Sequence, residues 1–238
     1  MLDPPSIEEP PRRCFLAWVQ FDGTNFCGYA RQKDERTVAD ELDKAWLKWR
    51  GERISVRSSS RTDSGVHARR MPLWVQTGLK IPPRAVVHGW NSELPFDVAI
   101  QSAARVSEDF HIRHDAIGKR YVYRLWNARV RSPMRRKDHW LVTRPLDTDA
   151  MIRAAGDFVG THDFSAFRAS HCQALTARRH ISKVDVQRDR EFVSIVVEGN
   201  AFLHNMVRII VGTLVEIGWG KIAPDSVPRI IASRQRDA

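Results

Sequence analysis

The sequence predicts an α+β fold of two halves, in which helices cover one face of a mostly antiparallel sheet. Two observations lead to this fold class. Runs with alternating apolar residues are interspersed with runs that repeat every three to four residues, which is typical of strands and helices in one chain. The two halves also show the same succession of elements, although no sequence repeat relates them. A chain of 238 residues with 42% apolar residues can bury one large core or two small ones.

The first half, residues 13–107, predicts the element order β-α-β-β-α-β. Thr37 is the expected N-cap of its first helix, and Gly51 is the expected end of that helix. The expected elements are a strand at 14–21, a helix at 38–50, strands at 54–56 and 72–75, a helix at 82–90 and a strand at 97–106. This order is the ferredoxin-like split arrangement.

The second half, residues 108–238, begins with an alternating strand and predicts a second ferredoxin-like half that shares the sheet. Its expected elements are a strand at 119–126, a helix at 147–159, strands at 180–188 and 191–198, a strongly apolar helix at 204–217 and a short helix at 224–233. Residues 1–12 are polar and rich in proline, which predicts a disordered tail.

The charge balance favours a polyanionic partner. The chain carries 38 basic and 28 acidic residues, for a formal net charge of +10 and a pI of about 10.1. Arginine outnumbers lysine 30 to 8, and a guanidinium both pairs with phosphate and stacks on bases. A genome that favours arginine codons would give the same bias, and charge alone does not separate RNA from DNA or anionic lipid.

Cysteine usage and hydropathy indicate a cytoplasmic protein without a membrane segment. Cys14, Cys27 and Cys172 are odd in number and widely spaced, so they predict neither a disulfide framework nor a metal site. The N-terminus lacks the apolar stretch of a signal peptide. No apolar run approaches the roughly 18 residues that a membrane span requires.

The most informative segment is the run Ser58-Ser59-Ser60-Arg61-Thr62-Asp63-Ser64-Gly65-Val66-His67-Ala68, which predicts a tight loop between two strands. Arg61 and Asp63 are two residues apart. A guanidinium close to a carboxylate favours its charged form, and an ionised, partly desolvated Asp63 can act as a nucleophile or a base. A solvated acid in an ordinary turn is the alternative that these residue types leave open.

Four blocks in one order resemble the TruA family of tRNA pseudouridine synthases. The loop run Arg-Thr-Asp-Ser-Gly-Val-His-Ala resembles that family's catalytic loop. The other blocks are Phe21–Gln32, Lys119–Tyr123 and Asn200–Arg208, and Asp163–Arg168 adds to them. Each block alone is a weak signal, whereas four in the same order are strong.

The resemblance implies isomerisation of uridine to pseudouridine in the anticodon stem–loop of tRNA, at positions 38–40, by a homodimer that uses no cofactor and no metal. Asp63 and Arg61 would be catalytic. Tyr121 would stack on the flipped uracil, although a tyrosine in a strand is more often a core residue. Arg208, Arg31 and Arg168 would bind the substrate, although a helix arginine is ordinarily solvated or paired.

The chain departs from the family pattern at three places. Tyr29 and Ala30 replace the usual Trp-Gln, and Ser60 replaces a glycine before Arg61. The family's final strand, which follows a Gly-Leu-x-Leu segment, is not found before residue 238. A missing strand would leave a sheet edge unpaired, so the alternative function is a weak or inactive tRNA-binding module. A hydrolase that uses Asp63 is a third reading, but it would lack the second carboxylate or metal ligands that such chemistry uses.

Overall fold

A computed structural model describes residues 12–170, 172 and 174–235. The chain forms two compact units, residues 1–116 and 117–238. Each unit has its own hydrophobic core and its own sheet.

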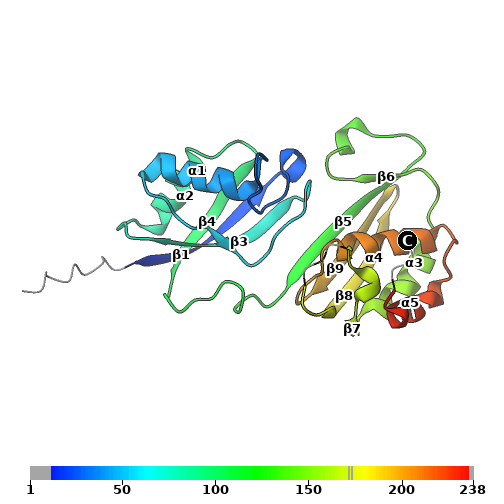
Figure 1. Ribbon diagram of the computed structural model, residues 1–238. Coiled ribbons are helices and arrows are strands. Elements are labelled where there is room, and N and C mark those ends of the chain that lie inside the picture. Colours follow the sequence, from blue (N-terminus) through cyan, green and yellow to red (C-terminus); the bar gives the residue numbers. More distant parts are fainter. Residues whose placement is uncertain (1–11, 171, 173, 236–238) are drawn as a thin grey trace, which may run out of the picture. The chain divides into compact units, whose positions relative to one another are not determined.

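Unit 1 is a four-stranded antiparallel sheet with two helices on one face (Figure 1). In chain order the elements are β1 (Arg13–Phe21), α1 (Val38–Arg50), β2 (Arg57–Ser58), β3 (Ala68–Thr77), α2 (Pro83–Asn91) and β4 (Val98–Val106). A single 3-10 turn, Gly23–Asn25, follows β1. The strand order is β2-β3-β1-β4, and the element order is the one that the sequence predicts.

The core of unit 1 lies between this sheet and both helices. Alternate residues of β1, among them Phe15 and Val19, face the helices because successive side chains of a strand point to opposite faces. The helices meet through Trp46 and Trp90, whose rings pack edge to face with centroids 4.9 Å apart. The Trp90 indole nitrogen donates to the Leu42 carbonyl at 2.9 Å, which satisfies a buried polar group.

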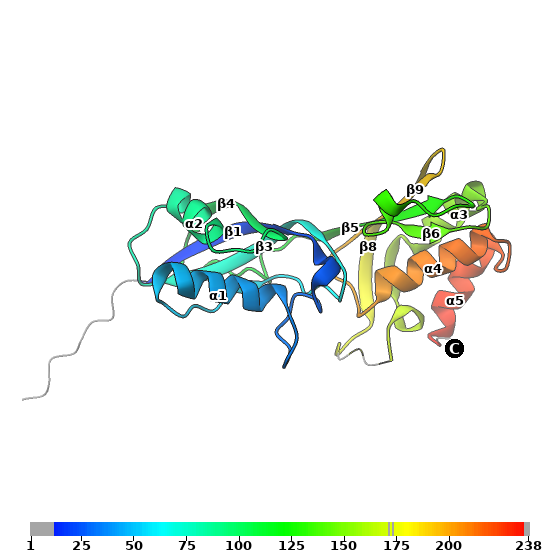
Figure 2. The same cartoon turned by 90° about the horizontal axis from the view of Figure 1, so that it is seen from above.

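Unit 2 is a five-stranded mixed sheet, order β6-β5-β9-β8-β7, with a large apolar core against three helices (Figure 2). The elements are β5 (Lys119–Asn127), β6 (Trp140–Val142), α3 (Thr148–Ala155), β7 (Gly160–Asp163), β8 (Arg178–Asp189), β9 (Phe192–Gly199), α4 (Met206–Gly218) and α5 (Val227–Ser233). Strands β5 and β6 pair in parallel, and the other pairs among the described strands of this unit are antiparallel.

Several element boundaries in the structure differ from the expected ones. The strand expected at 54–56 lies at 57–58 as β2, and the helix expected at 147–159 ends at residue 155 and continues as a 3-10 turn, Gly156–Phe158. Strands β6 and β7 were not predicted, because three or four residues are too few to show an alternating pattern. Helix α4 begins at Met206 rather than at 204, because Asn205 adopts a left-handed conformation with φ 58°.

The mixed α/β fold is therefore confirmed, while its finer description stays a prediction. That description comprises the ferredoxin-like halves and the missing last strand. The expected shared sheet differs from the structure, in which the described strands form two separate sheets, one in each unit. In the part of the chain that the structure describes, no helix is both long and apolar enough to cross a membrane.

Candidate active-site loop

The loop that carries Asp63 packs directly on a glycine of the segment that follows β1. Gly28 has φ +90°, and a Cβ at this position would lie 2.7 Å from the Thr62 carbonyl oxygen and 3.3 Å from the Asp63 carbonyl carbon. Next to it, the Tyr29 amide donates to the Thr62 carbonyl at 3.0 Å. Only glycine combines this backbone conformation with so close an approach. The loop's backbone is thereby fixed at the residue before Asp63.

The rest of the loop is held by the same segment. The Gly65 amide and the Ser64 hydroxyl both donate to the Phe26 carbonyl, each at 3.3 Å. A Cβ on Gly23 would lie 2.1 Å from the Val66 carbonyl oxygen, so this glycine too is required by close packing. Two motif blocks that are some 30 residues apart in the sequence thus form one structural element.

His67 closes the loop at its far end. Its Nδ1 lies 3.2 Å from the Gly23 amide and 3.1 Å from Asp22 Oδ1. The histidine tautomer decides whether this nitrogen accepts from the amide or donates to the carboxylate. Either bond ties the start of β3 to the end of β1.

Helix α1 supports the same segment from its other side. The first amides of a helix have no partner within the helix, and here Val38 donates to the Gly28 carbonyl at 3.2 Å and Ala39 to the Tyr29 carbonyl at 3.0 Å. Thr37 caps the helix by accepting from the Asp40 amide at 3.3 Å. The chain at Gly28 and Tyr29 is therefore clamped between the first turn of α1 and the Asp63 loop.

Tyr29, one of the departures from the family pattern, is a packing residue here. It is 5% exposed, and burial raises the pKa of its hydroxyl well above the usual range. Neither this hydroxyl nor the Thr62 hydroxyl has a hydrogen-bond partner among the described residues. A tyrosine so buried is a poor proton donor or acceptor near neutral pH.

The predicted site residues of unit 1 differ in their surroundings. Asp63 is half-buried in the loop, and Arg61 is exposed beside it. Arg31, expected to grip phosphate, contacts α1 instead: its guanidinium pairs with Asp43 and lies 3.6 Å from Asp40. Sequence reasoning missed this pairing, because it depends on the turn that brings Arg31 back to the helix.

In unit 2, Tyr121 lies on β5 opposite Val197 of β9, at the end of the strand next to the Asn200–Arg208 block. Its ring packs edge to face on Phe202 with centroids 5.2 Å apart. The Asn200 side-chain oxygen accepts from the amides of His180 and Ala201, at 3.1 and 2.7 Å, and so fixes the turn that presents Phe202. Tyr121 is half-exposed, whereas its neighbour two residues on, Tyr123, packs against the core.

The two other arginines predicted in unit 2 are both exposed and lie on connected segments. Arg208 is in the first turn of α4, and Arg168 directly follows a 3-10 turn, Ser165–Phe167. The Ala169 amide donates to the His204 carbonyl at 3.0 Å, which joins the two segments. Nearby, hydrogen bonds from Ser165 and the charges of Arg234 and Arg168 lower the pKa of Asp163 below its usual range.

The basic segment from Arg129 to Lys137 forms a projecting loop whose apolar residues are exposed as well. Val130 is 74% and Met134 87% exposed, while Arg135 lies with its guanidinium carbon 5.0 Å from the centre of the Phe192 ring. At the base of the loop, Arg124 pairs with Asp138 at 3.1 Å. The arrangement leaves most cations of this loop at the surface.

The predicted site residues thus fall into two groups, one in each unit. Arg31, Arg61 and Asp63 gather around the segment after β1, and Tyr121, Arg168 and Arg208 belong to unit 2. The described residues contain no group of three or more His, Cys, Asp or Glu side chains that could hold a metal ion.

Comparison with known proteins identifies the class. A family model described as tRNA pseudouridine synthase matches residues 17–115 and 154–238. These ranges include the segment after β1, the Asp63 loop and the Asn200–Arg208 block.

Individual relatives are similar over most of the chain. Proteins named tRNA pseudouridine synthase A from Pelobacter propionicus and Acetivibrio thermocellus are 45% and 43% identical over 218 residues, which is 92% of this chain and 89% of each relative. One from Myxococcus xanthus is 43% identical over 219 residues, 92% of this chain and 83% of the relative. The chain belongs to the tRNA pseudouridine synthase family, which confirms the resemblance seen in the sequence and favours an enzyme over an inactive RNA-binding module.

Proposed function

We propose that the protein isomerises uridine to pseudouridine in the anticodon stem–loop of tRNA, and that Asp63 carries the chemistry. The observation that supports this most is the packing of the Asp63 loop on Gly28 and Tyr29, which are themselves held by the first turn of α1. A catalytic group gains from such rigid support, because small displacements from the productive geometry cost rate.

The reaction needs a nucleophile or base and no redox chemistry. The bond from the ribose C1′ to the uracil N1 breaks, a bond from C1′ to C5 forms, and the C5 proton leaves while N1 gains one. Asp63 would attack or deprotonate at this centre, and Arg61 would help to occupy the space of the extruded nucleotide. The half-burial of Asp63 suits partial desolvation without loss of access.

Tyr121 would bind the flipped uracil by stacking. Its ring is half-exposed and is already oriented by Phe202, so little side-chain freedom is lost when a base packs on it. Arg168 and Arg208 are exposed cations and would bind the RNA backbone. Arg31 would have to leave Asp43 to do so, which makes it the weakest member of the predicted set.

The proposal extends to the setting of the reaction. The net charge of +10 favours tRNA as the partner. The family resemblance suggests a homodimer, and the cysteine usage suggests the cytoplasm.

The test uses tRNA transcribed with uridine that carries tritium at C5, because formation of the C1′–C5 bond releases that tritium to water. Wild-type protein should release tritium, and Asp63→Asn should release none while binding tRNA with unchanged affinity. Lys183→Gln, a change on the exposed face of β8, is the matched control and should behave as wild type. Release by Asp63→Asn at the wild-type rate would refute the role of Asp63.

A further inference from the structure

The sheet of unit 1 has a second face, which α1 and α2 do not cover. Residues of β1 and β3 alternate between the two faces, so Trp18, Arg70 and Trp74 point away from the helices while Val19 and Leu73 point toward them. Arg57 of β2 pairs directly with Trp74 and lies on the same side. We call the surface formed by Trp18, Arg57, Arg70 and Trp74 the open face.

One end of this sheet face is covered by other residues of unit 1. Phe110 and Ile112, which follow β4, pack with Cys14 and Trp74 in a small apolar cluster. Both Arg57 and Arg70 remain exposed. The open face therefore has a fixed apolar border and a charged, accessible surface.

Each arginine of the open face is stacked on a tryptophan. The guanidinium carbon of Arg57 lies 5.0 Å from the centre of the Trp74 ring, and that of Arg70 lies 4.5 Å from Trp18. Trp18 pairs with Pro72, so Trp74 is its diagonal neighbour on β3, about 7–8 Å away by the usual sheet geometry. Within the described part of the chain neither arginine forms an ion pair with a carboxylate. Stacking orients the guanidinium while its N–H groups stay available to an acceptor.

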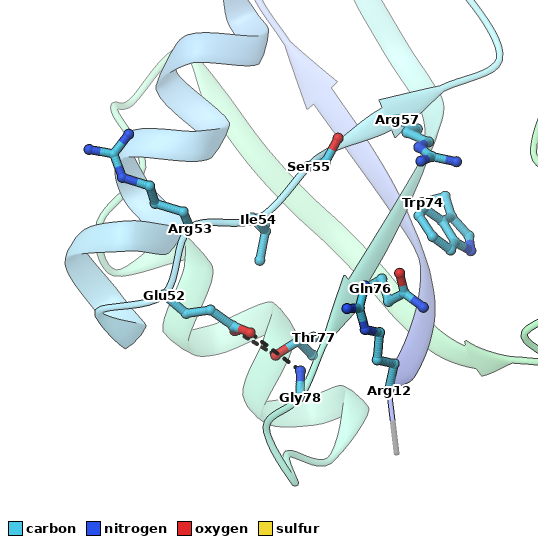
Figure 3. Close-up of a pocket in the computed structure, with 10 residues that line it drawn as sticks. All are labelled: Arg12, Glu52, Arg53, Ile54, Ser55, Arg57, Trp74, Gln76, Thr77 and Gly78. Carbon is cyan, nitrogen blue, oxygen red and sulfur yellow. Dashed lines mark hydrogen bonds between the residues drawn. The ribbon is translucent and has the colours of Figure 1, made fainter. Parts of the chain in front are cut away.

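Beside Arg57 lies a hollow of about 520 Å³. Three arginines, Arg12, Arg53 and Arg57, line it together with one acid, Glu52. Figure 3 shows Arg57 next to Trp74, with Gln76 and Arg12 further along and Arg53 pointing away. Glu52 accepts from the Thr77 hydroxyl at 2.6 Å and from the Gly78 amide at 3.3 Å, so its oxygens already have donors within the protein.

Trp74 is not explained by packing alone. It is 8% exposed, and its indole nitrogen is buried without a hydrogen-bond partner in the part of the chain that the structure describes. A buried donor without a partner is costly, and phenylalanine would fill similar space without that cost. The flat indole is, however, the best aromatic support for a guanidinium.

We propose that the open face and the adjoining hollow bind the phosphate backbone of RNA, with Arg57 and Arg70 as the principal contacts. Planar guanidinium groups bind phosphate oxygens with two parallel hydrogen bonds, and here they are oriented before the ligand arrives, which reduces the entropy lost on binding. The contacts reach phosphates and not base edges, so they position the RNA without reading its sequence. That the RNA is the tRNA substrate rests on the proposed function.

The test is the salt dependence of binding. The affinity of the full chain for an unmodified tRNA transcript is measured by fluorescence anisotropy over a range of salt concentrations, for wild type, Arg57→Gln, Arg70→Gln and the double variant. Each single change should weaken binding about tenfold near physiological salt and lower the slope of log affinity against log salt by about 0.7 to 0.9. Arg84→Gln is the matched control, because Arg84 is also an exposed arginine and lies on α2 of the same unit. It should leave both quantities near wild type.

Wild-type affinity and slope in the folded double variant would overturn the proposal, as would an equal loss in Arg84→Gln. Thermal melting checks the fold, and Arg57→Lys provides a second variant that keeps the charge: it should keep the slope but bind more weakly, because a lysine lacks the stacked planar fork. Tritium release separates the two proposals. If tritium release requires Asp63 but the arginine variants bind tRNA as wild type does, the open-face site alone is refuted. If the wild type binds tRNA through these arginines but releases no tritium, the proposed reaction alone is refuted.

Discussion

Replacing Gly28 by alanine should distort the Asp63 loop more than it destabilises the fold. The new Cβ would lie 2.7 Å from the Thr62 carbonyl oxygen, about 0.7 Å short of an ordinary contact of 3.4 Å. The contacting atom is backbone, so relief requires the loop or the segment after β1 to move. The residue's φ of +90° adds a conformational cost of about 1–2 kcal/mol for any L-residue.

A displacement of this size at the residue before Asp63 should reduce turnover by about 10²-fold, because a shift of about 1 Å in a catalytic group has that effect. The assay is single-turnover tritium release at saturating enzyme, which reports the chemical step, together with urea unfolding for stability. Gly51→Ala is the control: Gly51 also has a positive φ, of +67°, but its Cβ would meet nothing within 4 Å. It should lose only the conformational cost of about 1–2 kcal/mol and keep wild-type turnover.

Wild-type turnover in a folded Gly28→Ala protein would refute the reasoning, because it would show that the loop's position does not depend on this contact. An equal loss of turnover in Gly51→Ala would also refute it, because the effect would then follow from general destabilisation.

Three further predictions follow from single contacts. Tyr121→Ala should lower kcat/KM by the equivalent of about 1–3 kcal/mol, since a base loses its stacking partner, while Tyr121→Phe should keep most of that binding; wild-type kcat/KM in the alanine variant would contradict the stacking role. Thr37→Ala should cost about 1 kcal/mol in urea unfolding, because the helix loses its cap, and an unchanged midpoint would show that the cap is dispensable. Ser165→Ala should lower the free energy of unfolding at neutral pH and converge with wild type in acid: the lowered pKa of Asp163 gives stability that is present above its unfolded pKa of about 3.9 and lost as pH falls through the folded value. A difference that stays constant from pH 7 to pH 3 would contradict this assignment.

The helices and long strands could be predicted from the sequence because their signals are local. Thr37 and Gly51 mark the ends of α1 within a few residues of the chain that they act on, and the alternation in β1 and β9 is visible over eight or more residues. Strands β6 and β7 could not be predicted, because each is fixed by its neighbour in the sheet and not by its own three or four residues.

The candidate site was predictable only as a set of motifs. The resemblance selected Asp63 and the segment after β1 separately, but not the contact of Gly28 with Thr62 that unites them. In the sequence, the glycines Gly23 and Gly28 were the available signal that the segment after β1 packs closely on another stretch of backbone. The pairing of Arg31 with Asp43 and the stacking of Arg57 on Trp74 were missed for the same reason, since each depends on a turn or a strand register that no local pattern specifies.

Mapping the modified positions tests most directly whether the protein is a pseudouridine synthase whose chemistry depends on Asp63. An unmodified tRNA transcript with uridines in the lower anticodon stem is incubated with wild type or Asp63→Ala, and pseudouridines are located as carbodiimide-dependent stops in primer extension. We expect stops in the anticodon stem–loop with wild type and none with Asp63→Ala. Stops that persist with Asp63→Ala, or a folded wild type that binds tRNA and produces none, would contradict this expectation.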